Sequence, residues 1–286
     1  SSTRRTRART AACRCGCLAE HRLPLHPTGV PVTDPHPADL IPGAEPWSHQ
    51  GGPAGALVLH GFTGNPGSMR GVAEALADAG FTVDLPLLPG HGTKIEDMIP
   101  TGFADWSAHA EARYQDLAAR CEQVVVVGLS MGGALTAWLG AQHPEIAGLV
   151  CINAVVSVPP GMREAVAEVL ATGADRFAGI GSDIAKPGVV ETAYAETPLA
   201  PLLTLFDAAE EFGGRLGDIT APMLIVTSTQ DHVVPPDNSD LLAGAVSGPV
   251  ERLVCERSYH VVTQDYDADL VIERTVEFAR KVTAGA

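Results

Sequence analysis

A serine, an aspartate and a histidine lie far apart in this sequence, and each follows an apolar stretch. Ser130 stands in Gly128-Leu129-Ser130-Met131-Gly132, which fits the pattern G-x-S-x-G. A serine hydroxyl is a weak nucleophile at neutral pH, and it needs a base that is itself oriented by a carboxylate. A suitably placed base and acid would therefore distinguish a nucleophile from an incidental serine in a glycine-rich turn.

The residues around Ser130 predict a strand, a sharp turn and a helix. The run Val124–Val127 is β-branched, short and apolar on both faces, which is typical of a buried parallel strand. Residues 134–139 have helix-forming composition. This arrangement favours a nucleophile elbow, in which glycines let the chain pass closely and the new helix directs its N–H groups toward a developing oxyanion.

The acid should follow a later strand, because in such a fold the chain order is serine, acid, histidine. The strand predicted at 146–153 ends at Asn153, whose amide cannot compensate an imidazolium charge. The strand predicted at 223–227 is followed by Asp231, whereas Asp218 precedes that strand and lies at the wrong end of the sheet. Asp231 is the predicted acid.

The base should follow the last strand, and His260 lies between the strand predicted at 250–255 and the final helix. His232 adjoins the acid, and its side chain is expected to point away from it. His60 and His91 lie beside glycines in loops, where a histidine more often fixes loop geometry than takes part in catalysis. His260 is therefore the predicted base among the ten histidines.

The oxyanion donors should be main-chain N–H groups, one from the residue after the nucleophile and one from the loop after the first strand. These are Met131 and Phe62. The chemistry requires no metal and no organic cofactor.

Strands and helices alternate along most of the chain, which predicts an α/β fold with a mostly parallel, doubly wound sheet. At most one short strand is expected before the first buried one. Strands are expected at 56–59, 81–85, 124–127, 146–153, 223–227 and 250–255, and helices at 68–79, 106–120, 134–139, 238–245 and 268–282.

One interval interrupts this alternation. Between Val158 and Asp218 only two amphipathic helices are expected, near 162–171 and 201–212, and no strand. We interpret residues 159–217 as a cap over the carboxyl ends of the strands, where open α/β sheets bind ligands, and residues 39–158 and 218–286 as the core. The alternative is an insertion that packs elsewhere on the core.

Composition excludes some classes of function. The 286 residues are 45% hydrophobic and carry a net charge of −15, which is unfavourable for nucleic-acid binding. No uninterrupted apolar stretch is long enough to span a membrane. Residues 1–38 have a net charge of +4 and many prolines, and they are expected to form a disordered extension.

The cysteines indicate neither a metal site nor a disulfide framework. Cys13, Cys15 and Cys17 lack the spacing of a zinc site. The other three, at 121, 151 and 255, occur singly at or near strands and are expected to behave as small hydrophobic residues. A reducing cytoplasm is the expected compartment.

Five stretches in order give a family resemblance: HGFTGNP, LPGHGT, GLSMGG, QDHVVPP and SYHVVTQDYD. With them, residues 40–282 resemble the α/β-hydrolase superfamily, and within it the bacterial monoacylglycerol lipases and the small thermostable carboxylesterases. The resemblance implies the α/β-hydrolase fold and hydrolysis of a small-molecule ester. The stretch 161–179 departs from the family pattern, and the arginine-rich start has no counterpart in it.

The resemblance extends to the cap. It implies that Ile180, Glu191 and Asn153 contact a glycerol head group, while an acyl chain lies along apolar cap residues. Those expected are Leu199, Leu202, Leu203 and Phe206. From sequence alone Glu191 could instead be a solvated helix residue.

Three functional hypotheses remain open: a monoacylglycerol lipase, a carboxylesterase without glycerol preference, and a binding protein that keeps the scaffold without catalysis. Haloperoxidase-like or carbon–carbon hydrolase chemistry can also use such a triad. A monomer or small homo-oligomer is expected, without stable membrane insertion, and an apolar cap is compatible with transient lipid contact.

Overall fold

A computed structural model describes residues 39–284. The expectations for residues 1–38, including those for Cys13, Cys15 and Cys17, lie outside the described part. Within it, no helix is both long and apolar enough to cross a bilayer.

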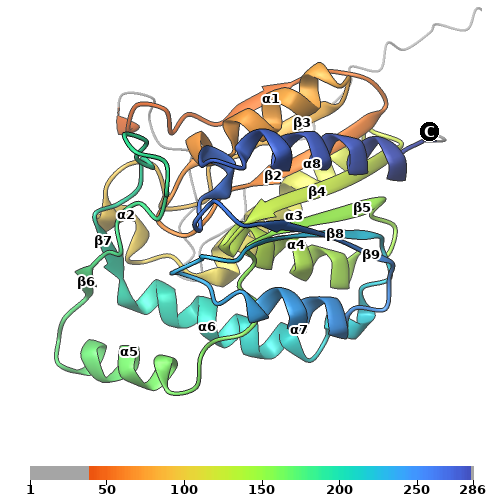
Figure 1. Ribbon diagram of the computed structural model, residues 1–286. Helices are drawn as coiled ribbons and strands as arrows, with labels where there is room; N and C mark the ends of the chain where they lie inside the picture. The colour runs from red at the N-terminus through yellow and green to blue at the C-terminus, as the bar shows by residue number, and fades with distance from the viewer. Residues whose placement is uncertain (1–38, 285–286) are drawn as a thin grey trace, which may run out of the picture. The chain divides into compact units, whose positions relative to one another are not determined.

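The described residues form a sheet of seven strands in the order β1-β3-β2-β4-β5-β8-β9 (Figure 1). Six strands are parallel, and β1 pairs antiparallel with β3 at one edge. The strands are β1 (Trp47–His49), β2 (Ala54–Leu59), β3 (Thr82–Leu85), β4 (Gln123–Leu129), β5 (Gly148–Ile152), β8 (Met223–Ser228) and β9 (Val250–Cys255). The predicted mostly parallel sheet, with one short strand before β2, is confirmed.

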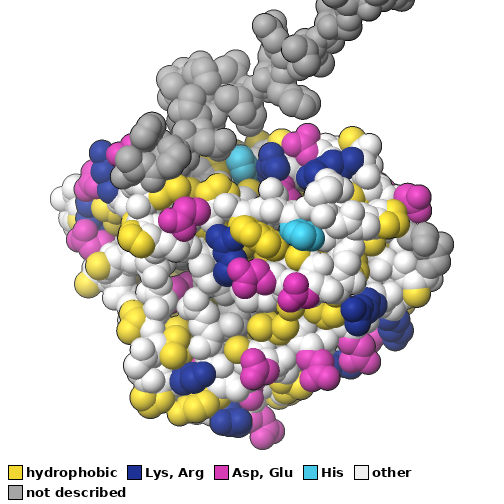
Figure 2. All heavy atoms as spheres, turned by 90° about the horizontal axis from the view of Figure 1, so that it is seen from above, with side chains coloured by type: hydrophobic (Ala, Val, Ile, Leu, Met, Phe, Trp, Pro, Cys, Tyr) yellow, Lys and Arg dark blue, Asp and Glu magenta, His cyan; other side chains and the backbone are white. Residues whose placement is uncertain are grey.

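Helices cover both faces of the sheet. One face packs against α1 and α8, and the other against α3, α4 and α7 (Figure 1). The helices of these layers are α1 (Arg70–Asp78), α3 (Phe103–Ala118), α4 (Met131–Gln142), α7 (Asp237–Ala245) and α8 (Ala268–Val282), and a short α2 (Ile95–Met98) lies in a connection. Figure 2 shows the molecule from the α1 and α8 side, where acidic and basic side chains are interspersed.

The central strand β4 shows why this architecture forms. Val124 and Val126 belong to the apolar cluster that includes α3 and α4, whereas Val125 and Val127 belong to the cluster that includes α1 and α8. Burying a valine contributes roughly 1.5–3 kcal/mol relative to leaving it exposed. A strand that is apolar on both faces is therefore most stable in the centre of a sheet covered on both sides.

Three helices begin two or more residues away from their predicted starts, and one of them is α4, which begins at Met131 rather than near residue 134. The first turn of the helix expected at 68–79 is a 3-10 helix, Pro66–Met69, because the Asn65 side chain accepts the N–H of Gly67 at 2.9 Å and caps it. Helix α3 begins at Phe103 rather than near 106. Its start is fixed by Asp105, whose carboxylate accepts the Gly102 N–H at 2.9 Å.

Residues 159–217 contain the two predicted helices, α5 (Met162–Ala171) and α6 (Leu199–Gly213), which pack against each other. The expectation of no strand there is wrong. Two three-residue strands, β6 (Arg176–Ala178) and β7 (Glu196–Pro198), pair antiparallel as a separate small sheet. This two-stranded ribbon lies in the connection between α5 and α6. Figure 1 shows β6 and β7 at the left of the molecule, near α2 and above α5.

Candidate active site

Ser130 occupies the sharp turn between β4 and α4. Its backbone angles are φ 58° and ψ −115°, a strained conformation for a residue with a side chain. Two glycines permit the turn. A Cβ at Gly128 would lie 2.0 Å from the Gly132 carbonyl oxygen, and one at Gly132 would lie 2.3 Å from the Leu59 carbonyl oxygen. The G-x-S-x-G spacing is therefore a steric requirement of this turn.

The loop after β2 runs beside Ser130. A Cβ at Gly61 would stand 3.4 Å from the Ser130 Cβ, so this loop passes at van der Waals distance. The next residue, Phe62, lines the cavity at Ser130 and packs edge-on against Trp106 with ring centroids 5.7 Å apart. Met131 begins α4, and the first N–H groups of a helix have no partner within the helix. The predicted oxyanion donors thus belong to the two segments that adjoin Ser130.

His60 and His91 are fully buried and hold this loop against its neighbour. His60 donates from Nδ1 to the Gly61 carbonyl at 3.0 Å and accepts the Leu88 N–H at Nε2 at 3.1 Å. His91 Nδ1 donates to the Pro89 carbonyl at 3.0 Å. Burial lowers the pKa of His60 well below its ordinary value, and that of His91 to about 4. Burial thus disfavours the charged form of both rings, and their hydrogen bonds to loop main chain agree with the predicted role in fixing loop geometry.

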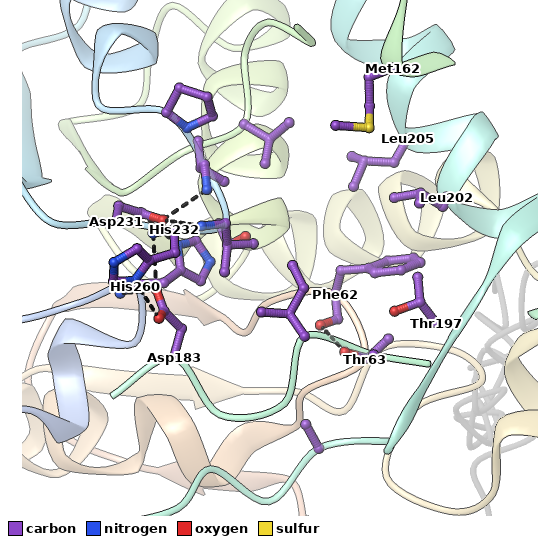
Figure 3. Close-up of a pocket in the computed structure, with 18 of the residues that line it drawn as sticks. Phe62, Thr63, Met162, Asp183, Thr197, Leu202, Leu205, Asp231, His232 and His260 are labelled. Atoms are coloured by element: carbon purple, nitrogen blue, oxygen red, sulfur yellow. Dashed lines mark hydrogen bonds and ion pairs between the residues drawn. The ribbon is translucent and has the colours of Figure 1, made fainter. Parts of the chain in front are cut away.

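Asp231 follows β8 and is held by the turn that comes after it. Its Oδ1 accepts the N–H groups of Val233 and Val234, each at 2.8 Å. Its Oδ2 accepts from His260 Nδ1 at 2.7 Å, and the Asp231 side chain is only 1% exposed (Figure 3). With Nδ1 donating to the carboxylate, Nε2 of the neutral imidazole is left as a proton acceptor. His260 and Ser130 line the same cavity.

His260 lies in the loop between β9 and a 3-10 turn, Val262–Gln264, and its main chain is held on both sides. Its N–H donates to Asp183 Oδ2 at 3.0 Å, and its carbonyl accepts from Asn153 Nδ2 at 2.7 Å. No local sequence pattern indicates either contact.

The cavity has a volume of about 530 Å³ and is lined both by residues that follow strands of the large sheet and by residues of the segment 159–217. Figure 3 shows Met162, Leu202 and Leu205 across the cavity from Asp231 and His260. The apolar side chains that α5, β6 and α6 contribute to its wall are Met162, Val166, Phe177, Leu202, Leu205 and Phe206.

Two of the four predicted acyl-chain residues line this cavity, namely Leu202 and Phe206. Leu199 is fully buried at the start of α6, and Leu203 is not part of the cavity wall. The periodicity of α6 explains the difference, because residues three and four apart share a helix face and Leu205 occupies the place expected for Leu203.

Ile180 and Glu191 also line the cavity, with Ile180 65% exposed at its rim. Glu191 lies outside any helix, and burial raises the pKa of its carboxyl to about 7, an effect opposed by nearby His260. The alternative that Glu191 is a solvated helix residue is therefore wrong. Its Oε1 lies 2.9 Å from where a Cβ on Gly64 would stand, so the carboxyl group packs against the loop after β2.

The structure does not place Asn153 in the cavity wall. Besides its bond to the His260 carbonyl, Asn153 Nδ2 donates to Ser228 Oγ at 3.0 Å, and Oδ1 accepts the Ser228 N–H at 2.8 Å. The side chain is buried and its amide is used by protein groups. Asn153 thus connects β5, β8 and the His260 loop, and the expectation that it contacts an alcohol group is not supported by this geometry.

Comparisons with known proteins agree with this geometry. A family model described as "Alpha/beta hydrolase family" matches residues 56–274. A thermostable monoacylglycerol lipase of Bacillus sp. (strain H-257) is 47% identical over 85% of this chain and 96% of its own length. A carboxylesterase of Bacillus subtilis (strain 168) is 28% identical over 83% of this chain and 97% of its own length.

Solved structures give the same result. A structure from work on the metagenome-derived lipolytic enzymes LipS and LipT is 42% identical with a TM-score of 0.82, covering 85% of this chain and 99% of that one. The sharp turn holds a strained serine, and a histidine bound to a carboxylate lines the same cavity. Known proteins match most of the chain. These observations lead to one assignment. The chain belongs to the alpha/beta hydrolase family.

Proposed function

We propose that this protein is a serine hydrolase that cleaves carboxylic esters, with monoacylglycerols as its main substrates. One observation carries the proposal. Ser130 and His260 line a single cavity, and His260 is oriented by Asp231 at 2.7 Å. The monoacylglycerol lipase that is 47% identical over most of both chains supports the substrate class.

In the proposed reaction Ser130 Oγ attacks the ester carbonyl while His260 Nε2 accepts its proton. Asp231 holds the ring and stabilises the imidazolium. The N–H groups of Phe62 and Met131 stabilise the oxyanion of the tetrahedral intermediate. His260 then returns the proton to the departing alcohol, and water releases the acid from the acyl-enzyme by the same steps.

We assign residues 159–217 as a cap that supplies the substrate pocket. Its apolar wall on α5 and α6 offers a surface for one acyl chain. Glu191 offers a carboxyl group that can exchange hydrogen bonds with alcohol hydroxyls, and Ile180 lies at the exposed rim. An apolar wall with few polar groups fits a single-chain ester of a small polyol.

A carboxylesterase without preference for glycerol is the second candidate. Two observations favour it: Asn153 is committed to protein groups, and a carboxylesterase is among the relatives. The two functions differ in how the alcohol part contributes to binding. Turnover of monoacylglycerols and of methyl esters with the same acyl chains, in the wild type and in Glu191→Ala, separates them. A glycerol preference that disappears in Glu191→Ala supports the lipase, and equal turnover of both series supports the esterase.

Catalysis itself is tested at Ser130. A fluorophosphonate should label Ser130 in the wild-type protein, and Ser130→Ala should lose several orders of magnitude in turnover while it keeps its fold. Full activity of Ser130→Ala, or no labelling of the wild type, would refute the mechanism. The second result would favour a binding protein on this scaffold.

Location and assembly stay predictions. Cys151 and Cys255 are buried free thiols, and burial raises the pKa of each to about 12. Inert buried thiols agree with the expected cytoplasmic location, because unpaired cysteines persist in a reducing compartment. Lipid contact through the cap and a monomeric or small oligomeric state are part of the same proposal.

A further inference from the structure

Three consecutive main-chain N–H groups around His260 are held by two aspartates. The Tyr259 N–H donates to Asp265 Oδ2 at 2.8 Å, and the His260 N–H donates to Asp183 Oδ2 at 3.0 Å. The Val261 N–H donates to the Asp183 main-chain carbonyl at 3.1 Å. Asp183 belongs to residues 159–217, so this segment forms part of the support for the His260 loop.

The same carboxylate also reaches the loop that contains Asp231. Asp183 Oδ2 accepts the His232 N–H at 3.1 Å, and Oδ1 pairs with His232 Nδ1 at 2.8 Å. One buried side chain thus joins the loop after β8 to the loop after β9. Figure 3 shows Asp183 beside both His232 and His260.

The main chain just after Asp183 is in turn hydrogen-bonded to a buried aspartate of the core. Asp265, which is 2% exposed, accepts the N–H groups of Ala185 at 2.7 Å and Lys186 at 2.9 Å. These bonds fix the main chain that carries Asp183. The main chain next to Asp183 is therefore tied to Asp265, which also holds the Tyr259 N–H, so the position of Asp183 does not depend on its own carboxylate bonds alone.

We propose that Asp183 is a positioning residue that aligns the imidazole of His260 through its main chain. The inference rests on the proposed function, in which His260 is the base. Asp231 fixes the ring at Nδ1, but the direction of Nε2 also depends on the peptide from which the ring projects. Asp183 holds the N–H of that peptide and Asn153 holds its carbonyl.

Removing Asp183 leaves the buried N–H of His260 and the part-buried N–H of His232 without their acceptor, and a buried N–H group without a partner shifts until it finds another. A misplacement of about 1 Å at a catalytic group can cost on the order of 10²-fold in rate. The contact with the His232 ring contributes little by comparison, because that side chain is 58% exposed to solvent.

Four variants test the proposal: Asp183→Ala, Asp183→Asn, Asp183→Glu and His232→Phe. Each is measured for kcat and KM on a water-soluble butyrate ester, for the rate of fluorophosphonate labelling at Ser130, and for Tm. Asp207→Asn is the matched control, because this exposed carboxylate lies in the same segment and pairs with Arg163.

The expected result is a loss of about 10²-fold in kcat and in labelling rate for Asp183→Ala, with KM little changed. Asp183→Asn keeps an oxygen for both N–H groups and should recover most of this loss. Asp183→Glu keeps the charge but moves it by one methylene, and should stay impaired. His232→Phe removes only the ring nitrogen that contacts Asp183 and keeps the main-chain N–H, so it should lose far less than Asp183→Ala.

The outcomes are separable. Wild-type labelling together with undiminished kcat in Asp183→Ala would overturn the inference and leave the proposed function intact. A fully active Asp183→Glu with an inactive Asp183→Asn would also overturn it, because charge rather than hydrogen-bond geometry would then matter. If Asp183→Ala fails to fold, the kcat values of Asp183→Asn and Asp183→Glu decide whether hydrogen-bond geometry or charge matters. Absence of wild-type labelling would refute the proposed function itself.

Discussion

Glu191 should make the stability of this protein depend on pH, and Glu191→Gln should remove that dependence. The carboxyl faces an apolar cavity, and burial raises its pKa from 4.5 to about 7. In the unfolded chain the same carboxyl is hydrated and has its ordinary pKa. The folded state therefore binds a proton more tightly than the unfolded state does, so that stability falls as pH rises between the two values.

The magnitude follows from the two pKa values. A difference between 4.5 and about 7 corresponds to about 3 kcal/mol of unfolding free energy, present below pH 4.5 and lost by pH 7 to 8. Glutamine has the size of glutamate and does not ionise in this range. The stability of Glu191→Gln relative to the wild type should therefore increase by up to about 3 kcal/mol from pH 4.5 to pH 8.

Urea unfolding of both proteins at half-unit steps from pH 4.5 to pH 8 measures this difference. Glu168→Gln serves as the control, since Glu168 is an exposed carboxylate on α5. Its stability difference from the wild type should stay constant over the same range. A difference between Glu191→Gln and the wild type that does not change with pH would refute the reasoning, because Glu191 would then ionise equally in the folded and unfolded states.

Three further substitutions probe the site. Asp231→Asn should lower kcat by about 10⁴-fold with the fold retained, because the amide favours the wrong tautomer of His260; near-normal ester turnover would contradict this. Gly132→Ala should destabilise the fold by about 3 kcal/mol or more in urea, because its Cβ would lie 2.3 Å from the Leu59 carbonyl oxygen, and an unchanged midpoint would contradict the steric argument. Leu202→Trp should lower kcat/KM for dodecanoyl esters while sparing butyrate esters, and a uniform effect on both would argue against an acyl site on α6.

The sheet could be predicted because its signals are local and strong. The run Val124–Val127 fits only a strand covered on both faces, and a parallel strand order brings every strand's carboxyl end to one edge. Residues that follow strands, such as Ser130, Asp231 and His260, must then lie near one another. The chain order of this fold reduced the choice among several carboxylates and histidines to one of each.

The contacts of individual polar side chains could not be predicted. Asn153 and Asp183 bond to groups far away in the sequence, and no local pattern specifies such partners. The ribbon of β6 and β7 is too short for a periodicity signal, with three residues in each strand. The face of α6 that lines the cavity depends on how the helix rotates as it packs, so the sequence alone does not distinguish Leu205, which lines the cavity, from Leu203, which does not.

If residues 159–217 act as the proposed cap, their contacts with the core limit how a substrate can reach Ser130. Asp183 is bound to the histidine loops, and farther along the cap the Tyr194 N–H donates to the Thr63 carbonyl at 3.1 Å while its hydroxyl donates to the Gly90 carbonyl at 2.8 Å. Lifting the whole cap would break the bonds that hold the His260 loop just as the substrate arrives. Helix α5 is held differently, because it packs against α6 and its Arg163 pairs with Asp207 of that helix. The contacts of residues 183–194 with the core therefore bear directly on the position of the base, whereas those of α5 stay within the 159–217 segment.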